Sequence, residues 1–257
     1  MNILISNDDG IDFVGLQVLV KAFSRLGDVY VTAPDRERSS NSHHVTIRDK
    51  VAISRRDVPY AKEAYALSGT PVDCVYLGLD LLYKGKIDLV VAGINKGANL
   101  SSDIVYSGTV AVAREAFMEG IPAVAVSLNS FHAVYYEQAA EYAVKITEKY
   151  LAAPDHDQYY LNINVPDLPG DQIKGLMVCD KACKLYYDNH LSMENIDGQD
   201  YICVNSLTLQ VERDPDDLRV DYNAVNSGYV AVSPMHVDQY AHERVSELEA
   251  CLRSEAL

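Results

Sequence analysis

The sequence contains no tryptophan, and only five of its 257 residues are cysteines. The cysteines lack the paired spacing that is typical of a disulfide framework or a structural zinc site. Cys179 and Cys183 are four residues apart, but no further soft ligands stand near them in the sequence. We therefore expect reduced thiols and no zinc site. The cysteines are Cys74, Cys179, Cys183, Cys203 and Cys251.

Basic residues are also scarce. Lysine and arginine together number 22 against 37 aspartates and glutamates, which gives a formal net charge of -15. The mean field of such a chain repels a nucleic-acid polymer and an anionic membrane surface, and no basic run offsets it. A small anionic substrate is still compatible with this charge when a bound divalent cation reverses the local potential.

Long apolar runs are missing as well, since none approaches the roughly 20 residues that cross a bilayer. The first residues, from Met1 to Ile5, lack the basic segment and the longer apolar stretch of a signal peptide. A cytoplasmic protein is the expectation. Apolar residues nevertheless make up 48% of the chain and charged residues 23%, which is the usage of a folded globular protein.

The hydrophobic pattern alternates between strands and helices in the first part of the chain. Short apolar runs at Ile3–Ile5, Val29–Val31 and Leu89–Ala92 are typical of buried strands. Apolar residues from Leu16 to Leu26 recur at helical spacing before Gly27 ends the helix. The other predicted elements are helices over 70–82, 109–119 and about 134–150, and strands over 122–128 and 160–165.

This alternation predicts an α/β fold, with a Rossmann-like, mostly parallel sheet and helices on both faces, over residues 1–172. An antiparallel β-excursion is expected within residues 45–68. After about Ile173 the helical rhythm gives way to short β-like segments, which predict a β-rich arm over residues 173–235 that serves oligomerisation. A closing amphipathic helix is expected in residues 236–257, packed on its own core or on a neighbouring subunit.

Two adjacent carboxylates, Asp8 and Asp9, directly follow the first predicted strand. Like charges this close repel one another unless a cation lies between them, and Gly10 permits a backbone that lets both side chains reach one ion. The dipeptide alone fits a solvated acidic turn or a helix cap as well as it fits a metal site. Its position matters, because ligands of parallel sheets bind beyond the carboxyl ends of the strands.

Other loops at the same expected edge supply hard oxygen donors. Ser39 and Asn95 belong to this group, and such ligands suit Mg²⁺, Mn²⁺ or Ca²⁺ and not zinc. Ser107, Gly108 and Thr109 directly precede a predicted helix, so their N–H groups and hydroxyls could bind a phosphate at the positive end of the helix dipole. Ser107 or Thr109 fits a plain helix cap equally well, and the two uses are compatible.

Five motifs follow one another along nearly the whole chain. They are Asn7 to Gly10, Ala33 to Ser39, Gly69 to Val75, Gly93 to Leu100 and Tyr106 to Val110. In their order and spacing they resemble the SurE family of survival-protein nucleotidases. The sequence departs from the family pattern at Val14, where a proline is common, in a shortened loop after Ser39, and at Ser101, where a glycine usually stands.

The resemblance implies a 5'-nucleotidase, a phosphomonoesterase that acts on nucleoside monophosphates and, in some members, on 3'-nucleotides or short polyphosphate. It implies one divalent cation per subunit, Mg²⁺ or Mn²⁺, and homo-oligomers, dimers or tetramers, that exchange C-terminal elements. The implied metal ligands are Asp8, Asp9, Ser39 and Asn95. The implied phosphate contacts are Asn99, Ser107, Gly108 and Thr109.

The expected mechanism is in-line attack on the phosphoryl group by a water whose pKa the cation lowers, with Asp8 and Asp9 as the catalytic residues. One rival reading makes Asp8 a covalent nucleophile, but that chemistry expects an Asp-x-Asp motif and a downstream lysine. Another is a non-catalytic regulator that binds nucleotide or metal on the same fold. Nearby, His43 and His44 fit a solvated pair better than a lining of the pocket.

Overall fold

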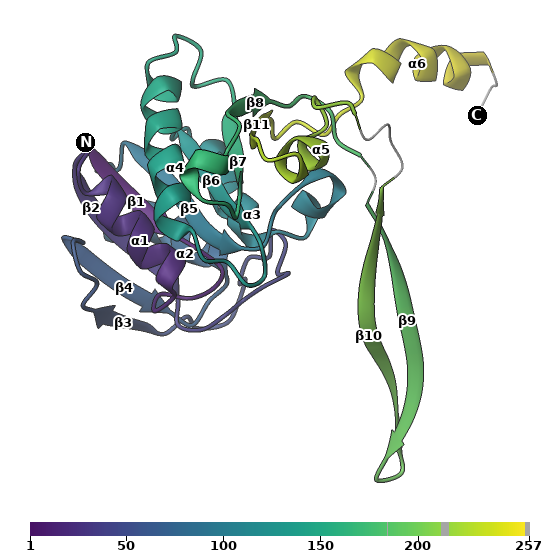
Figure 1. Cartoon of the computed structure of the whole chain (residues 1–257), viewed down its shortest axis with the longest axis horizontal. Helices are drawn as coiled ribbons and strands as arrows, with labels where there is room; N and C mark the ends of the chain where they lie inside the picture. The colour runs from purple at the N-terminus through teal and green to yellow at the C-terminus, as the bar shows by residue number, and fades with distance from the viewer. Residues whose placement is uncertain (184, 212–215, 255–257) are drawn as a thin grey trace.

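The computed structural model describes residues 1–183, 185–211 and 216–254, and within them nine strands form one sheet (Figure 1). The order across the sheet is β3-β4-β2-β1-β5-β6-β7-β11-β8. Strands β4, β2, β1, β5, β6 and β7 are mutually parallel, so the predicted mostly parallel α/β fold is confirmed. The bounds are β1 (Asn2–Ser6), β2 (Asp28–Pro34), β3 (Ile53–Arg56), β4 (Glu63–Leu67), β5 (Leu89–Lys96), β6 (Ala123–Asn129), β7 (Tyr160–Pro166), β8 (Leu176–Val178) and β11 (Val230–Met235).

Helices cover both faces of the sheet, as predicted (Figure 1). Ile3 and Ile5 of β1 belong to a hydrophobic cluster with α1 and α4, whereas Leu4 belongs to a second cluster with α2 and α3. This division follows from the strand geometry, because successive side chains point to opposite faces. The helices are α1 (Val14–Phe23), α2 (Pro71–Leu77), α3 (Gly108–Met118) and α4 (Tyr136–Leu151).

Helix α2 begins at the predicted cap. The Thr70 hydroxyl accepts from the Asp73 N–H at 3.1 Å, and the Asp73 carboxylate accepts from the Thr70 N–H at 2.8 Å, which together form a capping box. The α-helix ends at Leu77, and the predicted extension to Leu82 is a π-helical turn over Gly78–Leu82.

The segment after the Ser39 loop differs from its prediction. Strand β4 pairs parallel with β2 and so extends the main sheet, while β3 pairs antiparallel with β4. The prediction of β-structure from Val45 onward is wrong for the residues before Ile53, where β3 begins. The Thr46 N–H and hydroxyl donate to the Asp73 carboxylate at 2.8 and 2.5 Å, and this contact holds the preceding chain against α2.

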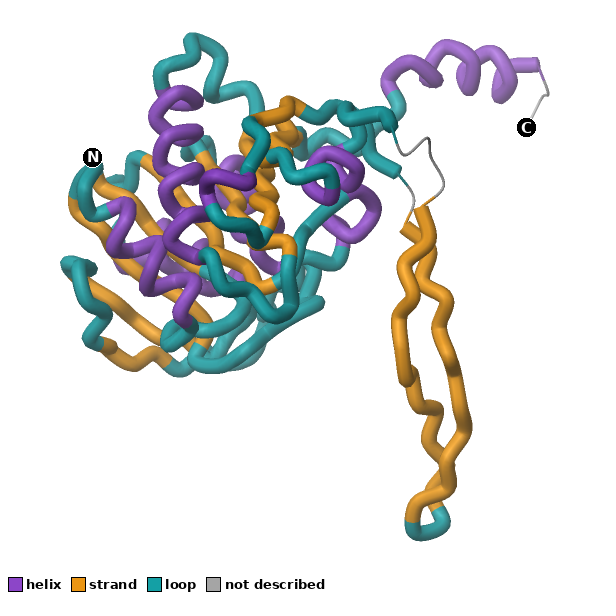
Figure 2. Tube along the Cα trace, in the orientation of Figure 1, coloured by secondary structure: helices purple, strands orange, loops and turns teal. Residues whose placement is uncertain are grey.

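The C-terminal third contributes to the sheet and also leaves it. Strand β11 pairs antiparallel with β7 and β8 pairs parallel with β11, so both lie in the main sheet. A long hairpin of β9 (Leu185–Ile196) and β10 (Gln199–Val211) projects away from the body (Figures 1 and 2). The short helix α5 (Asp221–Asn226), which lies beside β11, was not predicted.

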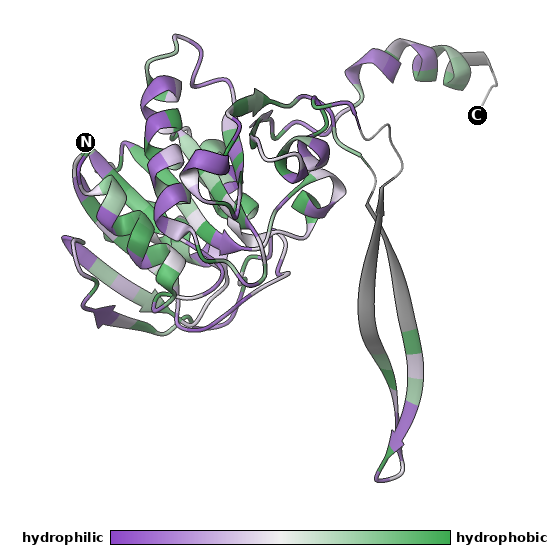
Figure 3. Ribbon diagram, in the orientation of Figure 1, coloured by the Kyte–Doolittle hydropathy of each residue, from purple (hydrophilic) through white to green (hydrophobic). Residues whose placement is uncertain are grey.

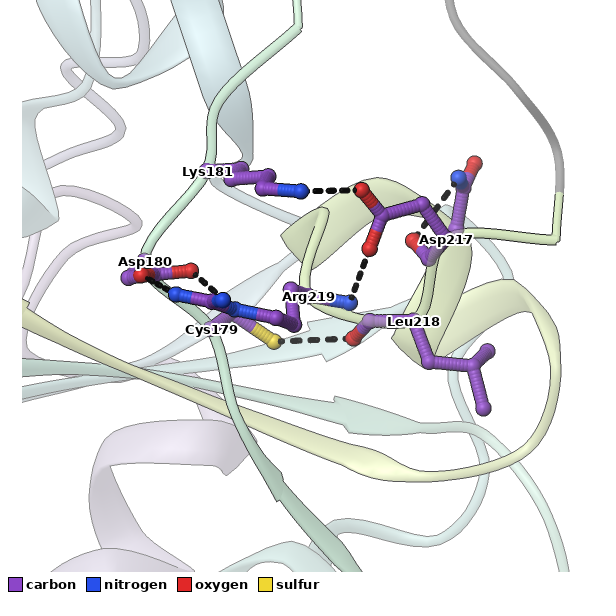
Figure 4. A network of polar contacts seen from close by, with 7 residues as sticks. Cys179, Asp180, Lys181, Asp217, Leu218 and Arg219 are labelled. Atoms are coloured by element: carbon purple, nitrogen blue, oxygen red, sulfur yellow. Dashed lines mark hydrogen bonds and ion pairs between the residues drawn. The ribbon is translucent and has the colours of Figure 1, made fainter.

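Two ion pairs bind the chain segments that enter and leave this hairpin (Figure 4). Lys181 Nζ lies 2.5 Å from Asp217 Oδ2, and Arg219 Nε donates to Asp180 Oδ1 at 2.8 Å. Each pair therefore joins the segment before the hairpin to the segment after it.

The closing helix is shorter than expected. Helix α6 spans Val245–Ser254, after a 3-10 turn at His242–Arg244, whereas the sequence pattern placed its start at His236. Figure 3 shows hydrophilic and hydrophobic residues alternating along it, and Leu248 is 59% exposed. Residues 255–257 of the predicted helix lie outside the described residues. Among the helices that are described, none is long and apolar enough to cross a membrane.

Candidate metal and phosphate site

The site lies beyond the carboxyl ends of β1 and β5. Strand β1 pairs with β2 on one side and β5 on the other, so the chain builds the sheet outward from β1 in one direction and then returns to build in the other. Such a reversal of strand order leaves a crevice where ligands bind. Asp8 and Asp9 follow β1 directly, and Asn95 lies near the end of β5.

Asp8 is buried and held by the first turn of α3. Thr109 Oγ1 donates to Asp8 Oδ1 at 2.6 Å, and the backbone N–H groups of Gly108 and Thr109 also bond this carboxylate. A Cβ atom at Gly108 would lie 2.9 Å from Asp8 Oδ2, so only glycine permits this approach. Burial raises the pKa of Asp8 in spite of these hydrogen bonds.

Asp9 is only partly buried, and the N–H of Lys96 donates to its Oδ2 at 3.3 Å. Burial and then repulsion from Asp8 raise the pKa of Asp9 to about 7, and Glu37 adds to the repulsion. Among the described residues, no lysine or arginine side chain forms an ion pair with Asp8 or Asp9. The charge of Lys96 lowers the pKa of Asp9 without forming an ion pair, and it does not offset burial and the repulsion from Asp8.

The turn that presents them is closed by Asn7. Its Nδ2 donates to the Gly10 carbonyl at 2.9 Å and its Oδ1 accepts from the Gly10 N–H at 3.2 Å. Gly10 has φ 102°, a conformation that favours glycine. The sequence predicts no separate role for Asn7, although an Asn three residues before a glycine at a strand end is a recognisable turn signal.

Ser39 and Asn95 reach the same corner by different routes. The Arg38 N–H donates to the Asp8 carbonyl at 2.7 Å, which ties the Ser39 loop to the end of β1, while the Ser39 hydroxyl donates to Glu37 at 2.8 Å. Asn95 Nδ2 donates to the Gly97 carbonyl at 2.8 Å, and its Oδ1 lies 3.5 Å from the Thr109 hydroxyl that also bonds Asp8. The structure thus brings Asn95 to the carboxylates and places Ser39 next to a residue bonded to Asp8.

The donor set fits a hard divalent cation. It combines two carboxylates with a hydroxyl and an amide oxygen, which are the ligands that Mg²⁺ and Mn²⁺ prefer. Among the described residues, no group of three or more His, Cys, Asp or Glu side chains could hold a metal ion. A cation between Asp8 and Asp9 would relieve the repulsion that raises the pKa of Asp9.

Asn99 is buried in a network of amides. Its Nδ2 donates to Ser127 Oγ at 2.8 Å and its backbone N–H donates to Asn164 Oδ1 at 2.8 Å. Asn162 and Asn164 in turn donate to the Asn99 carbonyl at 2.8 and 3.0 Å. The network fixes the loop after β5, and the alternating asparagines of β7 were its signal in the sequence. A phosphate contact by Asn99 stays a prediction.

The start of α3 caps the helix and also contacts Asp8. Ser107 Oγ accepts from the Val110 N–H at 3.0 Å, so Ser107 is the helix cap. Gly108 and Thr109 are directed at Asp8. That all three also contact a phosphate stays a prediction.

A family model described as "Survival protein SurE" matches residues 3–188. The chain belongs to the SurE family. It is 38% identical over 255 residues to a protein of Mannheimia succiniciproducens named 5'-nucleotidase SurE, covering 99% of this chain and 100% of that one. A Petrotoga mobilis protein of the same name is also 38% identical, with coverage of 98% and 99%. The crystal structure of the SurE protein from Aquifex aeolicus is similar with a TM-score of 0.82 at 32% identity, covering 98% of this chain and 100% of that one.

At Ser101 this SurE chain has a contact that compensates for the missing glycine. Ser101 has φ 51°, its N–H donates to Asp221 Oδ2 at 2.7 Å, and its hydroxyl donates to Asp221 Oδ1. Asp221 belongs to α5 and is buried. The Cys183 N–H donates to Ser101 Oγ at 3.1 Å, so the loop after β5 is also bonded to the chain that enters the hairpin.

His43 is not solvated, which corrects the expectation from the sequence. Its Nε2 lies 2.7 Å from Glu115 Oε2, and the two side chains are 22% and 12% exposed. The Ser42 N–H donates to the Tyr106 carbonyl at 3.0 Å. These contacts hold the Ser39 loop of this SurE protein on the outer side of α3, whereas His44 is exposed.

Proposed function

We propose that the protein hydrolyses nucleoside 5'-monophosphates to nucleoside and phosphate, with one Mg²⁺ or Mn²⁺ per subunit. Asp8, Asp9, Ser39 and Asn95 would hold the cation. The observation that supports this most is a pair of carboxylates that forms no ion pair with a lysine or arginine of the described residues, at the reversal of strand order and beside the start of α3. The names of the relatives supply the nucleotide part of the proposal.

A cation held there supplies positive charge beside the phosphoryl group and lowers the pKa of a nearby water. Asp8, fixed by Thr109, serves as a ligand of constant orientation. Asp9 is less buried than Asp8 and accepts the proton of the attacking water. The N-terminal end of α3, with Ser107 as its cap, faces the negative charge that develops on the phosphoryl oxygens.

Further parts of the proposal concern other substrates, the oligomeric state and the location. Hydrolysis of 3'-nucleotides and short polyphosphate would use the same site, because the cation binds a phosphoryl group and not a base. We propose a homodimer or tetramer that exchanges the hairpin and α6, since both elements carry exposed apolar side chains. We also propose a cytoplasmic location. The exposed side chains are Leu191, Met193, Ile196, Tyr201, Ile202, Val245, Leu248 and Leu252.

The test is phosphate release from AMP and GMP by purified protein with Mg²⁺ or Mn²⁺. We expect release that stops with EDTA, returns with added metal, and falls at least about a hundredfold in Asp9→Asn, which retains size and shape but loses the charge. An Asp12→Asn variant, an exposed carboxylate beyond the turn, is the matched control and should retain activity. Metal and nucleotide binding without any release would instead favour a non-catalytic regulator.

A further inference from the structure

Phe131 is exposed in a loop that follows the carboxyl end of β6. Its side chain is 79% exposed, although phenylalanine is among the residues most often buried. Its ring has no polar atom and is accessible to a ligand. The loop leaves the sheet at the same edge as Asp8 and Asn95, because β1, β5 and β6 are parallel.

The ring lies against the backbone of Gly97. A Cβ atom at Gly97 would be 2.9 Å from Phe131 Cε1 and 3.3 Å from its Cδ1, so the ring lies directly over the backbone of Gly97. Gly97 also has φ 102°. Its N–H donates to the Leu128 carbonyl at 3.0 Å, which joins the loop after β5 to the end of β6. The ring is therefore supported on one side and open on the other.

Gly97 is also the residue that orients Asn95. Its carbonyl accepts from Asn95 Nδ2 at 2.8 Å, which leaves Asn95 Oδ1 near Thr109 and the carboxylates. Gly97 thus contacts both the Phe131 ring and the Asn95 side chain, which places the ring next to the loop that carries Asn95.

We propose that Phe131 stacks on the nucleobase of the substrate and sets the affinity for nucleotides over other phosphate esters. The inference rests on the proposed function, which puts the phosphate at Asp8 and Asp9. An exposed aromatic ring beside a phosphate site offers a stacking platform, and such platforms accept every base because each base has a π-face. Purine and pyrimidine nucleotides are therefore both accepted, with a preference for the larger stacking area.

Tyr106 is the other exposed ring close to the site, at 62%, and it precedes the cap Ser107. Its hydroxyl gives water a partner, so its exposure needs no ligand. Its carbonyl accepts from the Ser42 N–H at 3.0 Å, which gives the residue a role in holding the Ser39 loop. Phe131 has neither feature, and for this reason we assign the base to Phe131.

The experiment compares kcat and KM for AMP with those for ribose 5-phosphate, which has the same phosphoryl ester without the base. In Phe131→Ala we expect KM for AMP to rise about tenfold, with kcat and the constants for ribose 5-phosphate nearly unchanged. Phe131→Tyr should behave like the wild type, and Phe131→Leu, which is apolar without a ring, should behave like Phe131→Ala. Tyr106→Ala should leave the ratio of the two substrates as it is.

Three results would overturn the proposal. One is an equal loss on both esters in Phe131→Ala, which would mean that the ring acts by supporting Gly97. Another is an unchanged KM for AMP, whether or not the oligomeric state of the variant changes. The third is a selective loss in Tyr106→Ala alone. A wild-type protein that hydrolyses neither ester would instead refute the proposed function, a failure that the first substrate pair reveals before any variant is made.

Discussion

Thr109 Oγ1 donates a hydrogen bond of 2.6 Å to Asp8 Oδ1 across 101 residues of sequence. The bond joins the first turn of α3 to the end of β1, and both groups are buried. It is the contact that connects the two halves of the candidate site, since the same hydroxyl lies 3.5 Å from Asn95 Oδ1. The orientation of Asp8 therefore depends on this bond.

Replacing Thr109 by valine retains the shape of the side chain and removes the hydroxyl. We expect kcat/KM for AMP to fall about tenfold, because Asp8 loses a hydrogen bond to its charged form and its pKa rises further. Thr109→Ser retains the hydroxyl and should retain most of the activity. Steady-state kinetics at saturating Mn²⁺ measure this, and full activity in Thr109→Val would contradict the assigned role of the bond.

Gly108 allows α3 to approach Asp8. In Gly108→Ala the new Cβ would lie 2.9 Å from Asp8 Oδ2 and 3.1 Å from Pro71, so we expect activity to fall at least about tenfold as the helix start moves away. Gly85→Ala is the control: Gly85 has φ 67° and open space around it, so that change costs about 1 kcal/mol of stability and no activity. Equal activity loss in both variants would argue against a specific effect at Asp8.

Ser101 and Asp221 form the bond that compensates for a serine at positive φ. Ser101→Ala leaves the Asp221 carboxylate buried with one partner fewer, and we expect the free energy of unfolding to drop by about 1 to 3 kcal/mol. Ser40→Ala is matched to it, because Ser40 also has positive φ, at 58°, but is exposed. That control should change stability by less than about 0.5 kcal/mol in urea unfolding.

The same carboxylate predicts a dependence of stability on pH. Burial raises the pKa of Asp221 above 3.8, so at pH values just above 3.8 the folded state holds a proton that the unfolded state has lost. The contribution of Asp221 is then present at low pH and falls as pH rises through the folded pKa. Relative to Asp221→Asn, which does not titrate, the wild type should lose stability as the pH rises above about 3.8. Urea unfolding of both proteins at several pH values measures the difference, and a difference that is constant with pH would contradict the shift.

Local signals were sufficient to predict much of the fold. The apolar runs of β1, β2 and β5 and the Thr70–Asp73 cap depend on neighbours in the sequence, and each lies where expected. Local signals do not predict which strands pair. The pattern of β4 does not say that its partner is β2, so the sequence suggested an excursion where the structure has a continuous sheet. Helix α5 has six residues, too few for a helical period to be recognised.

The residues of the candidate site could also be predicted from the sequence only in part. Asp8 and Asp9 could be proposed from their adjacency at a strand end, and Asn95 and Ser39 as oxygen donors in loops at the same sheet edge, a set that the family resemblance also implies. The bond between Thr109 and Asp8 and the bond between Ser101 and Asp221 join residues 101 and 120 positions apart, and no local pattern records them. The pairing of His43 with Glu115 was missed for the same reason.

The most direct test of the central claim is the position of a bound Mn²⁺ in crystals of the protein, located by its anomalous scattering. We expect one peak per subunit, among Asp8, Asp9, Ser39 and Asn95, and its loss in crystals of Asp9→Asn. A peak elsewhere, or none in crystals of a protein that still hydrolyses AMP, would contradict the proposed metal site.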